Sequence, residues 1–175
     1  MNTSSKKSAR RKSWRNFILS LLLLIIVVAA IRAWQQRDVA SGMAPRLVGV
    51  KLDGNAYALP VKPAQPVLVH FWASWCGICR AQQGSIDAIA LGYPNTITIA
   101  IQSGSDAEVG RHLVEQGLHF SVLNDTYGQL SAAWGVQGVP TTFIISQDGQ
   151  IRFTEVGYTT SLGLRLRLWL AEKLA

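Results

Sequence analysis

The feature that most constrains this chain is a pair of cysteines, Cys76 and Cys79, placed between a strand-like run and a helix-like run. Residues 66–72, PVLVHFW, are apolar over the length of a buried strand, and residues 77–90 can form a helix. Residues i and i+3 of a helix share one face with their backbones about 5 to 6 Å apart, so such a pair can close a disulfide without moving the backbone. The chain has no other cysteine. The spacing therefore favours a local redox pair.

The two sulfurs are expected to have different roles. Cys76, in the first turn of the predicted helix, would face unpaired backbone N–H groups and the positive end of the helix dipole, which stabilise a thiolate over a thiol. Cys79 lies one turn deeper. This predicts Cys76 as the attacking nucleophile and Cys79 as the thiol that resolves a mixed disulfide.

Three other interpretations of the pair compete with redox chemistry. Half of a zinc site is disfavoured, because there is no second C-x-x-C and the three histidines lack ligand spacing (His70, His112 and His119). A structural disulfide across four residues would stabilise little. A copper-handling binding protein, holding Cu(I) on the cysteines without turnover, stays as the alternative function, although neither methionine is near them in sequence. The favoured interpretation needs no metal or other cofactor.

The rest of the chain alternates between strand and helix periods, which predicts an α/β sandwich with a mixed sheet and flanking helices. The closing helix is expected to have Leu162, Leu166, Trp169 and Leu170 on its apolar side. The expected elements are a hairpin (47–52 and 56–59), strands at 66–72, 96–101 and 120–124, helices at 77–90, 106–116 and 127–134, a second hairpin (141–146 and 150–156) and a helix at 161–174.

The N-terminal region carries a membrane signal. Residues 17–31, FILSLLLLIIVVAAI, are free of charge, and Trp14 and Trp34 lie where interfacial aromatic side chains anchor a helix. A cleaved signal peptide is the alternative, but no small-x-small pair closes the apolar run. We expect a cytoplasmic basic tail (1–16), a transmembrane anchor (17–34), a linker (35–46) and a folded domain (47–175).

The positive charge is concentrated before the apolar run. Six of the 17 basic residues precede Asn16, which leaves 11 basic against 10 acidic residues in the remainder of a chain whose formal net charge is +7. A nucleic-acid partner is therefore not expected, because the domain has no source for a basic face. The same charge asymmetry predicts that the N-terminus lies in the cytoplasm and the domain outside.

Two motifs, VLVHFWASWCGICR and GVQGVPTTFII, resemble those of the thioredoxin fold, in order and at a fitting distance. With the N-terminal anchor, residues 47–175 are most similar to bacterial membrane-tethered thioredoxin-like proteins of the cytochrome c maturation reductase and suppressor-of-copper-sensitivity D types. The resemblance implies a thioredoxin-like sandwich, protein thiol:disulfide oxidoreductase activity, an inner-membrane protein with a periplasmic domain, and a cis Val139–Pro140 bond facing the cysteines.

The neighbours of the cysteines are expected to receive the substrate. Pro140 removes one N–H from the strand that follows, so backbone groups of Val139 could pair with an extended partner segment. Trp75 is expected in the docking surface and Trp72 in the core. The substrate-binding set is completed by two residues at the start of the helix, Gly77 and Ile78.

His70 departs from the family pattern, since thioredoxins resemble one another in having a buried aspartate at this position. A neutral imidazole near Cys79 could accept the proton of the resolving thiol. A buried, hydrogen-bonded core histidine explains the residue equally well.

The expected partners are protein substrates that carry cysteines and a membrane protein that donates electrons, because the periplasm is kept oxidising and has no thiol buffer of its own.

Overall fold

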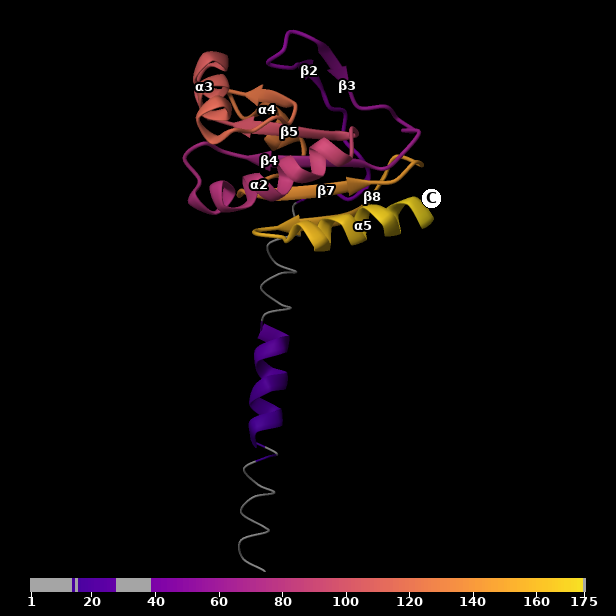
Figure 1. Ribbon diagram of the computed structural model, residues 1–175. Helices are drawn as coiled ribbons and strands as arrows, with labels where there is room; N and C mark the ends of the chain where they lie inside the picture. The colour runs from indigo at the N-terminus through magenta and orange to yellow at the C-terminus, as the bar shows by residue number, and fades with distance from the viewer. Residues whose placement is uncertain (1–13, 15, 28–38, 175) are drawn as a thin grey trace, which may run out of the picture. The chain divides into compact units, whose positions relative to one another are not determined.

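The computed structural model describes residues 14, 16–27 and 39–174 (Figure 1). The chain divides into two units, Met1–Arg37 and Asp38–Ala175. In the first unit, residues 16–27 form a helix with exposed side chains. Among the described residues, no helix combines the length and apolarity needed to cross a membrane. Part of the predicted anchor (residues 28–34) lies outside the described residues, and so does nearly all of the predicted tail (1–16).

The second unit is built on a six-stranded mixed sheet, in agreement with the predicted α/β class. Strands β4, β5 and β6 are parallel, whereas β7 is antiparallel to β4 and to β8, and β1 is antiparallel to β8. The order is β1-β8-β7-β4-β5-β6, with β1 at Gly42–Met43, β4 at Val67–Trp72, β5 at Thr96–Ile101, β6 at Val122–Asp125, β7 at Thr141–Ile145 and β8 at Gln150–Val156.

Helices cover both faces of this sheet. Helices α2 (Gly77–Gly92), α3 (Asp106–Gln116) and α5 (Ser161–Lys173) contribute to one core, which we call the first core. The short helix α4 (Gln129–Ala133) lies against a second core on the opposite face. Ser105 caps α3, and its side chain and that of Glu108 form a reciprocal capping box.

Strand β4 is buried along all six residues because it lies between β5 and β7 with a core on each face. Side chains alternate across a strand. Leu68 and Trp72 therefore point into the first core, and Val69 and Phe71 point into the second. The continuous apolar run that predicted this strand is explained by this burial on both faces.

The described part of the segment predicted as a linker (residues 35–46) belongs to the folded unit. Val39 is buried in the second core, and β1 pairs with β8 through Gly42 and Met43. The folded unit therefore begins before Leu47. The polar and small composition indicated a linker, but a two-residue edge strand needs no apolar pattern, because backbone hydrogen bonds alone hold it.

The predicted hairpin near the start of the domain is present as a separate two-stranded sheet. Strands β2 (Val48–Val50) and β3 (Ala56–Ala58) are antiparallel. Gly54 between them has a φ of 83°, a conformation that glycine adopts without steric cost.

Helix α5 faces the core with a different side from the one expected. Leu164, Leu168 and Ala171 are buried, whereas Leu162 is 77% exposed and Leu166 and Trp169 are each 54% exposed. The helix is apolar on two opposite sides, and both sides have helical spacing. The sequence pattern identified one of these sides, and the structure buries the other.

Candidate active site

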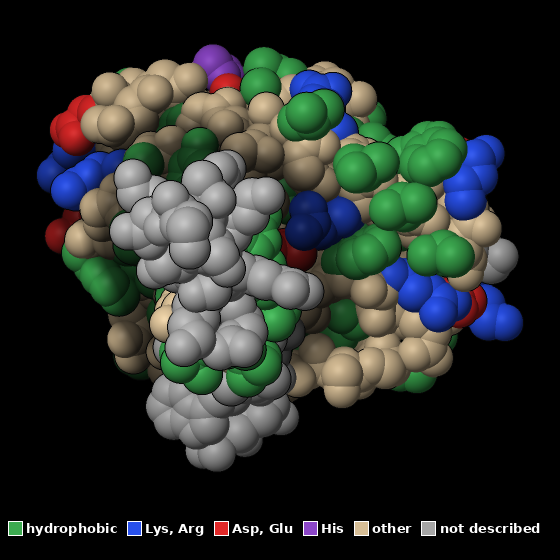
Figure 2. Space-filling view, turned by 90° about the horizontal axis from the view of Figure 1, so that it is seen from below, with side chains coloured by type: hydrophobic (Ala, Val, Ile, Leu, Met, Phe, Trp, Pro, Cys, Tyr) green, Lys and Arg blue, Asp and Glu red, His purple; other side chains and the backbone are tan. Residues whose placement is uncertain are grey.

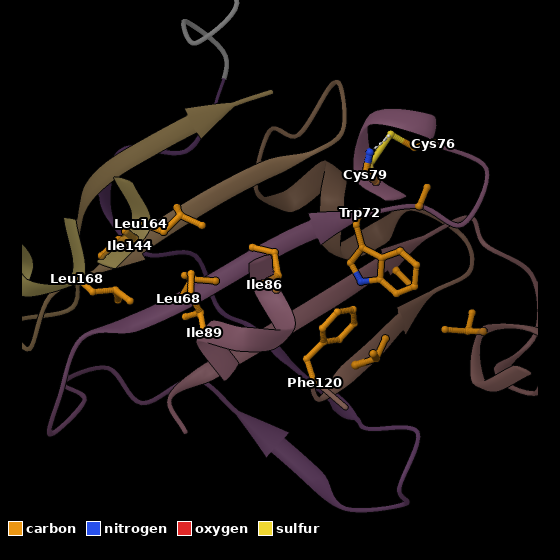
Figure 3. Packing of buried hydrophobic residues seen from close by; sticks show 14 of the residues in the cluster. Leu68, Trp72, Cys76, Cys79, Ile86, Ile89, Phe120, Ile144, Leu164 and Leu168 are labelled. Carbon is orange, nitrogen blue, oxygen red and sulfur yellow. Dashed lines mark hydrogen bonds between the residues drawn. A yellow bond between two sulfur atoms is a disulfide. The ribbon is translucent and has the colours of Figure 1, made fainter. Parts of the chain in front are cut away.

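Strand β4 and helix α2 together position the cysteine pair. The strand ends at Trp72, and Cys76 is the N-cap of α2, with extended backbone angles. The backbone N–H of Cys79 donates a hydrogen bond to Sγ of Cys76 at 3.1 Å. The two residues form a disulfide with their Cα atoms 5.2 Å apart, within the usual range for such a bond (Figure 3).

The two sulfur-bearing residues differ in accessibility. Cys76 is 8% exposed, and Cys79 is fully buried among the residues of the first core. Figure 3 shows the pair at the end of the layer that also holds Trp72 and Ile86. An incoming sulfur can therefore approach Cys76 from solvent, whereas Cys79 is reached only from within the site.

The second motif meets the first at this point. The Val139–Pro140 peptide bond is cis, and Pro140 directly precedes β7. Sγ of Cys76 lies 3.7 Å from the backbone carbonyl oxygen of Val139. The structure thus brings Cys76, Cys79, Val139 and Pro140 together although about sixty residues separate the two motifs.

Exposed apolar side chains surround the disulfide on its solvent side. Trp75 is 61% exposed, Ile78 is also exposed, and Gly77 opens the first turn of α2 beside them. Trp75 and Val139 line a groove of about 290 Å³. The four residues expected to bind substrate therefore lie around Cys76.

Two residues of this groove were not predicted from the sequence. The carbonyl oxygen of Gln102 accepts a hydrogen bond from Nε1 of Trp75 at 3.1 Å and so orients the indole ring. Gln102 has a φ of 44°, and nothing in a glutamine indicates that backbone conformation. Tyr127 also lines the groove and is highly exposed. An aromatic residue in a polar turn was the only available signal for it.

His70 lies in the middle of β4 and is fully buried. Its Nδ1 is 2.9 Å from Oγ1 of Thr142 on β7, and no described residue is a hydrogen-bond partner of its Nε2. Because side chains alternate along a strand, His70 faces the same side of the sheet as Leu68 and Trp72, the side that holds Cys79. This buried, hydrogen-bonded position fits both interpretations from the sequence, and the role as a base stays a prediction.

A second buried polar residue on this side, Gln82, was also missed. Gln82 is fully buried, and both polar atoms of its amide lack a partner among the described residues. It follows Cys79 by three positions, on the helix stripe that continues to Ile86 and Ile89. A glutamine inside an apolar stripe was the signal that could have identified it.

Burial sets the charge state of His70. Removal of the ring from water disfavours the imidazolium and lowers the pKa of His70 from 6.5 to about 3. The ring is therefore neutral at physiological pH while the cysteines are joined.

The other two histidines have partners away from the cysteines. His112 hydrogen-bonds to Gln83 and stacks on Trp72, with ring centroids 5.4 Å apart. His119 pairs with Asp87. The described residues contain no group of three or more histidine, cysteine or acidic side chains that could hold a metal ion.

A disulfide at a helix start, opposite a loop that precedes an antiparallel strand of a mixed sheet, defines the class of thioredoxin-like thiol:disulfide oxidoreductases. The Redoxin family model matches residues 38–162, and the chain belongs to this family. It is 31% identical to a thioredoxin-like protein of Haemophilus influenzae over 88% of this chain and 92% of that protein. It is 27% identical to the thiol:disulfide interchange protein DsbE of Escherichia coli over 90% and 91% of the two chains.

Solved structures show the same fold. A thiol:disulfide interchange protein of the thioredoxin family from Chlorobium tepidum superposes with a TM-score of 0.65 at 22% identity, covering 77% of this chain and 98% of that one. The predicted thioredoxin-like fold is thus confirmed. The protein is a thiol:disulfide oxidoreductase of the DsbE type.

The neutral state of His70 predicts how stability depends on pH. The unfolded chain binds this proton near pH 6.5 and the folded chain only near pH 3, so the free energy of unfolding should fall as the pH drops below about 6.5. The contribution of this residue to the slope is at most about 1.4 kcal/mol per pH unit. Urea unfolding between pH 8 and pH 4 should show a flatter profile for His70→Asn than for the native chain. Parallel profiles would show that His70 is not held neutral.

Proposed function

We propose that the protein is tethered to the bacterial inner membrane and reduces or exchanges disulfides of protein substrates in the periplasm. One observation carries the choice of chemistry. The disulfide lies at a helix start, with Cys76 8% exposed and Cys79 fully buried. The names of the relatives as thiol:disulfide interchange proteins support it.

The reaction begins with the reduced pair. The thiolate of Cys76 attacks one sulfur of a substrate disulfide, the substrate S–S bond breaks, and one substrate sulfur leaves as a thiolate that takes a proton. The thiolate of Cys79 then attacks Sγ of Cys76. The mixed disulfide breaks, the second substrate thiol is released, and the Cys76–Cys79 disulfide forms, so two electrons have passed to the substrate.

The loop before β7 is proposed to align the substrate. An extended segment that pairs with the backbone of Val139 would bring its own sulfur toward Cys76, since the Val139 carbonyl oxygen is 3.7 Å from that sulfur. Trp75 and Ile78 offer apolar contacts on either side. Pro140 contributes no N–H, while its carbonyl oxygen accepts a hydrogen bond from the backbone N–H of Gly157 at 2.8 Å.

His70 is proposed to accept the proton of Cys79. If Nδ1–H donates to Oγ1 of Thr142, the lone pair of Nε2 is free to receive it. The pKa near 3 describes the site with its cysteines joined. A thiolate formed at Cys79 would favour the imidazolium, because an opposite charge nearby stabilises the charged form. The competing role is a neutral core residue that only fills space.

The membrane attachment rests on the sequence of residues 17–31, the tryptophans at either end and the basic head. Electrons for repeated reduction would come from a membrane protein, because the periplasm supplies no thiol buffer.

Variants of the two cysteines test the reaction. Cys79→Ser removes the resolving thiol, so mixed disulfides should accumulate on Cys76, whereas Cys76→Ser should trap few or none. Non-reducing gels of cell extracts measure the trapped species, and insulin reduction by the purified protein should be lost in both variants. Equal trapping by both would contradict the assigned roles, and stoichiometric copper without turnover would support the copper-binding alternative.

The role of His70 can be separated from its packing. If His70 accepts the proton, His70→Ala should slow the release of mixed disulfides and change the pH dependence of that step, while attack by Cys76 persists. Leu68→Ala is the matched control, because it opens a cavity on the same strand and face. Both changes should cost roughly 2 to 5 kcal/mol of stability. Stopped-flow fluorescence at several pH values, beside urea unfolding, measures both effects. A normal release step in a destabilised His70→Ala protein would leave His70 as a core residue.

The attachment predicts fractionation behaviour. If residues 17–34 are an uncleaved anchor, the full-length protein should stay in the membrane fraction after a carbonate wash at high pH. A shorter soluble form beginning near Pro45 would contradict the anchor. Such processing would also remove β1 and the buried Val39 from the domain.

A further inference from the structure

Helix α5 has an apolar face that the domain leaves uncovered. Leu162, Leu166 and Trp169 follow one another at helical spacing on the side opposite Leu164 and Leu168, and we call these three residues the outer stripe. All three are more than half exposed. Single exposed apolar residues are ordinary, but a row of three that includes a tryptophan indicates a surface that contacts a membrane or another protein.

Basic side chains accompany the outer stripe. Arg165 and Lys173 are exposed on α5, and Glu172 is its only acidic residue. One N–H of Arg165 donates a hydrogen bond to the carbonyl oxygen of Ala88 on α2 at 3.0 Å. Arg167 is already paired with Glu155 on β8. Figure 2, which looks onto the side of the domain where α5 lies in Figure 1, shows hydrophobic side chains gathered among Lys and Arg side chains. A helix that carries tryptophan and leucine beside basic residues is typical of one that lies in a membrane interface.

The chain joins the folded unit at the β8 edge of the sheet, the edge on which α5 packs. Val39 is buried, and β1 pairs with β8, the strand beside β7. Helix α5 packs on β7 and β8. The outer stripe and the first strand therefore both lie at the β8 edge of the sheet, with α5 on the face of the first core and Val39 in the second core on the opposite face.

The connection to the predicted anchor is short. Five peptide units separate Trp34 from Val39 and can span at most about 18 Å. A domain of this size has a radius of gyration of about 14 Å. If residues 17–34 cross the membrane, this short connection keeps Val39, the first described residue of the domain, within about 18 Å of the membrane end of the anchor.

We propose that the outer stripe of α5 lies in the lipid headgroup region of the membrane, with the helix parallel to the surface. The proposal rests on the proposed membrane attachment. Leu162, Leu166 and Trp169 enter the boundary between headgroups and acyl chains, and Arg165 and Lys173 meet anionic headgroups.

This placement orients the dithiol. Strand β8 is parallel to β4, because both are antiparallel to β7. Helix α5 follows β8 and helix α2 follows β4, so both helices begin at the same end of the sheet. With α5 flat on the bilayer, Cys76 faces sideways along the membrane. The disulfide is then presented to the extramembrane part of a neighbouring membrane protein.

Spin labelling of the full-length chain tests the proposal. The chain with Cys76→Ser and Cys79→Ser receives a nitroxide at Leu166→Cys and is reconstituted into liposomes of phosphatidylethanolamine and phosphatidylglycerol. The matched control carries the label at Val114→Cys, which is 82% exposed on α3. We expect the label at 166 to collide severalfold less with a water-soluble nickel chelate, and more with oxygen, than the label at 114.

Flotation of the liposomes is measured first, because it separates the two proposals. Chain that floats while both labels remain equally accessible to nickel overturns the placement of α5 and leaves the anchor intact. Chain that does not float overturns the anchor and the placement together. Dipolar broadening between labels at 166 would assign the outer stripe to a second copy of this chain and would also overturn the lipid proposal.

Discussion

The burial of β4 on both faces is the constraint on which the rest of the site depends. The strand pairs with β5 on one side and β7 on the other, and its six residues are inaccessible to water. The end of β4 at Trp72 is therefore held in a fixed position in the sheet, and Cys76 follows Trp72 by four residues. The pairing with β7 also fixes the start of β7, and with it the position of Pro140 directly before Thr141. The two motifs meet because the first contains β4 and the second contains β7, which pairs with β4.

Local signals were sufficient for most of the fold. The apolar runs at 66–72 and 96–101, the cap at Ser105 and the turn at Asp148-Gly149 each act over a few residues, and the corresponding elements begin and end within a few residues of the predicted bounds. Cys76 and Val139 could be assigned to one site only through the resemblance to a known family. Spacing along the chain carries no information about a contact across sixty residues.

The remaining differences arise where packing chooses between equivalent options. Helix α5 has two apolar sides, and only the position of the sheet decides that Leu164 and Leu168 are buried and Leu166 is not. The edge strand at Gly42 forms through backbone hydrogen bonds that place no demand on side chains. The positive φ of Gln102 is likewise imposed by the loop around it.

The buried polar atoms on the side of β4 that holds Cys79 reduce the stability of the fold, and packing alone does not explain their presence. A buried polar atom without a partner costs about 1 to 3 kcal/mol. Five such atoms occur among the described side chains, and three of them belong to His70 and Gln82, on the side of β4 that holds Cys79. Apolar residues of similar size would fill this layer at lower cost, as Leu68 and Ile86 do beside it. The proposed reaction would give these atoms a use, because a resolving thiol at Cys79 would lose its proton away from water, where the lone pair of His70 and the amide of Gln82 can stabilise a proton or a thiolate.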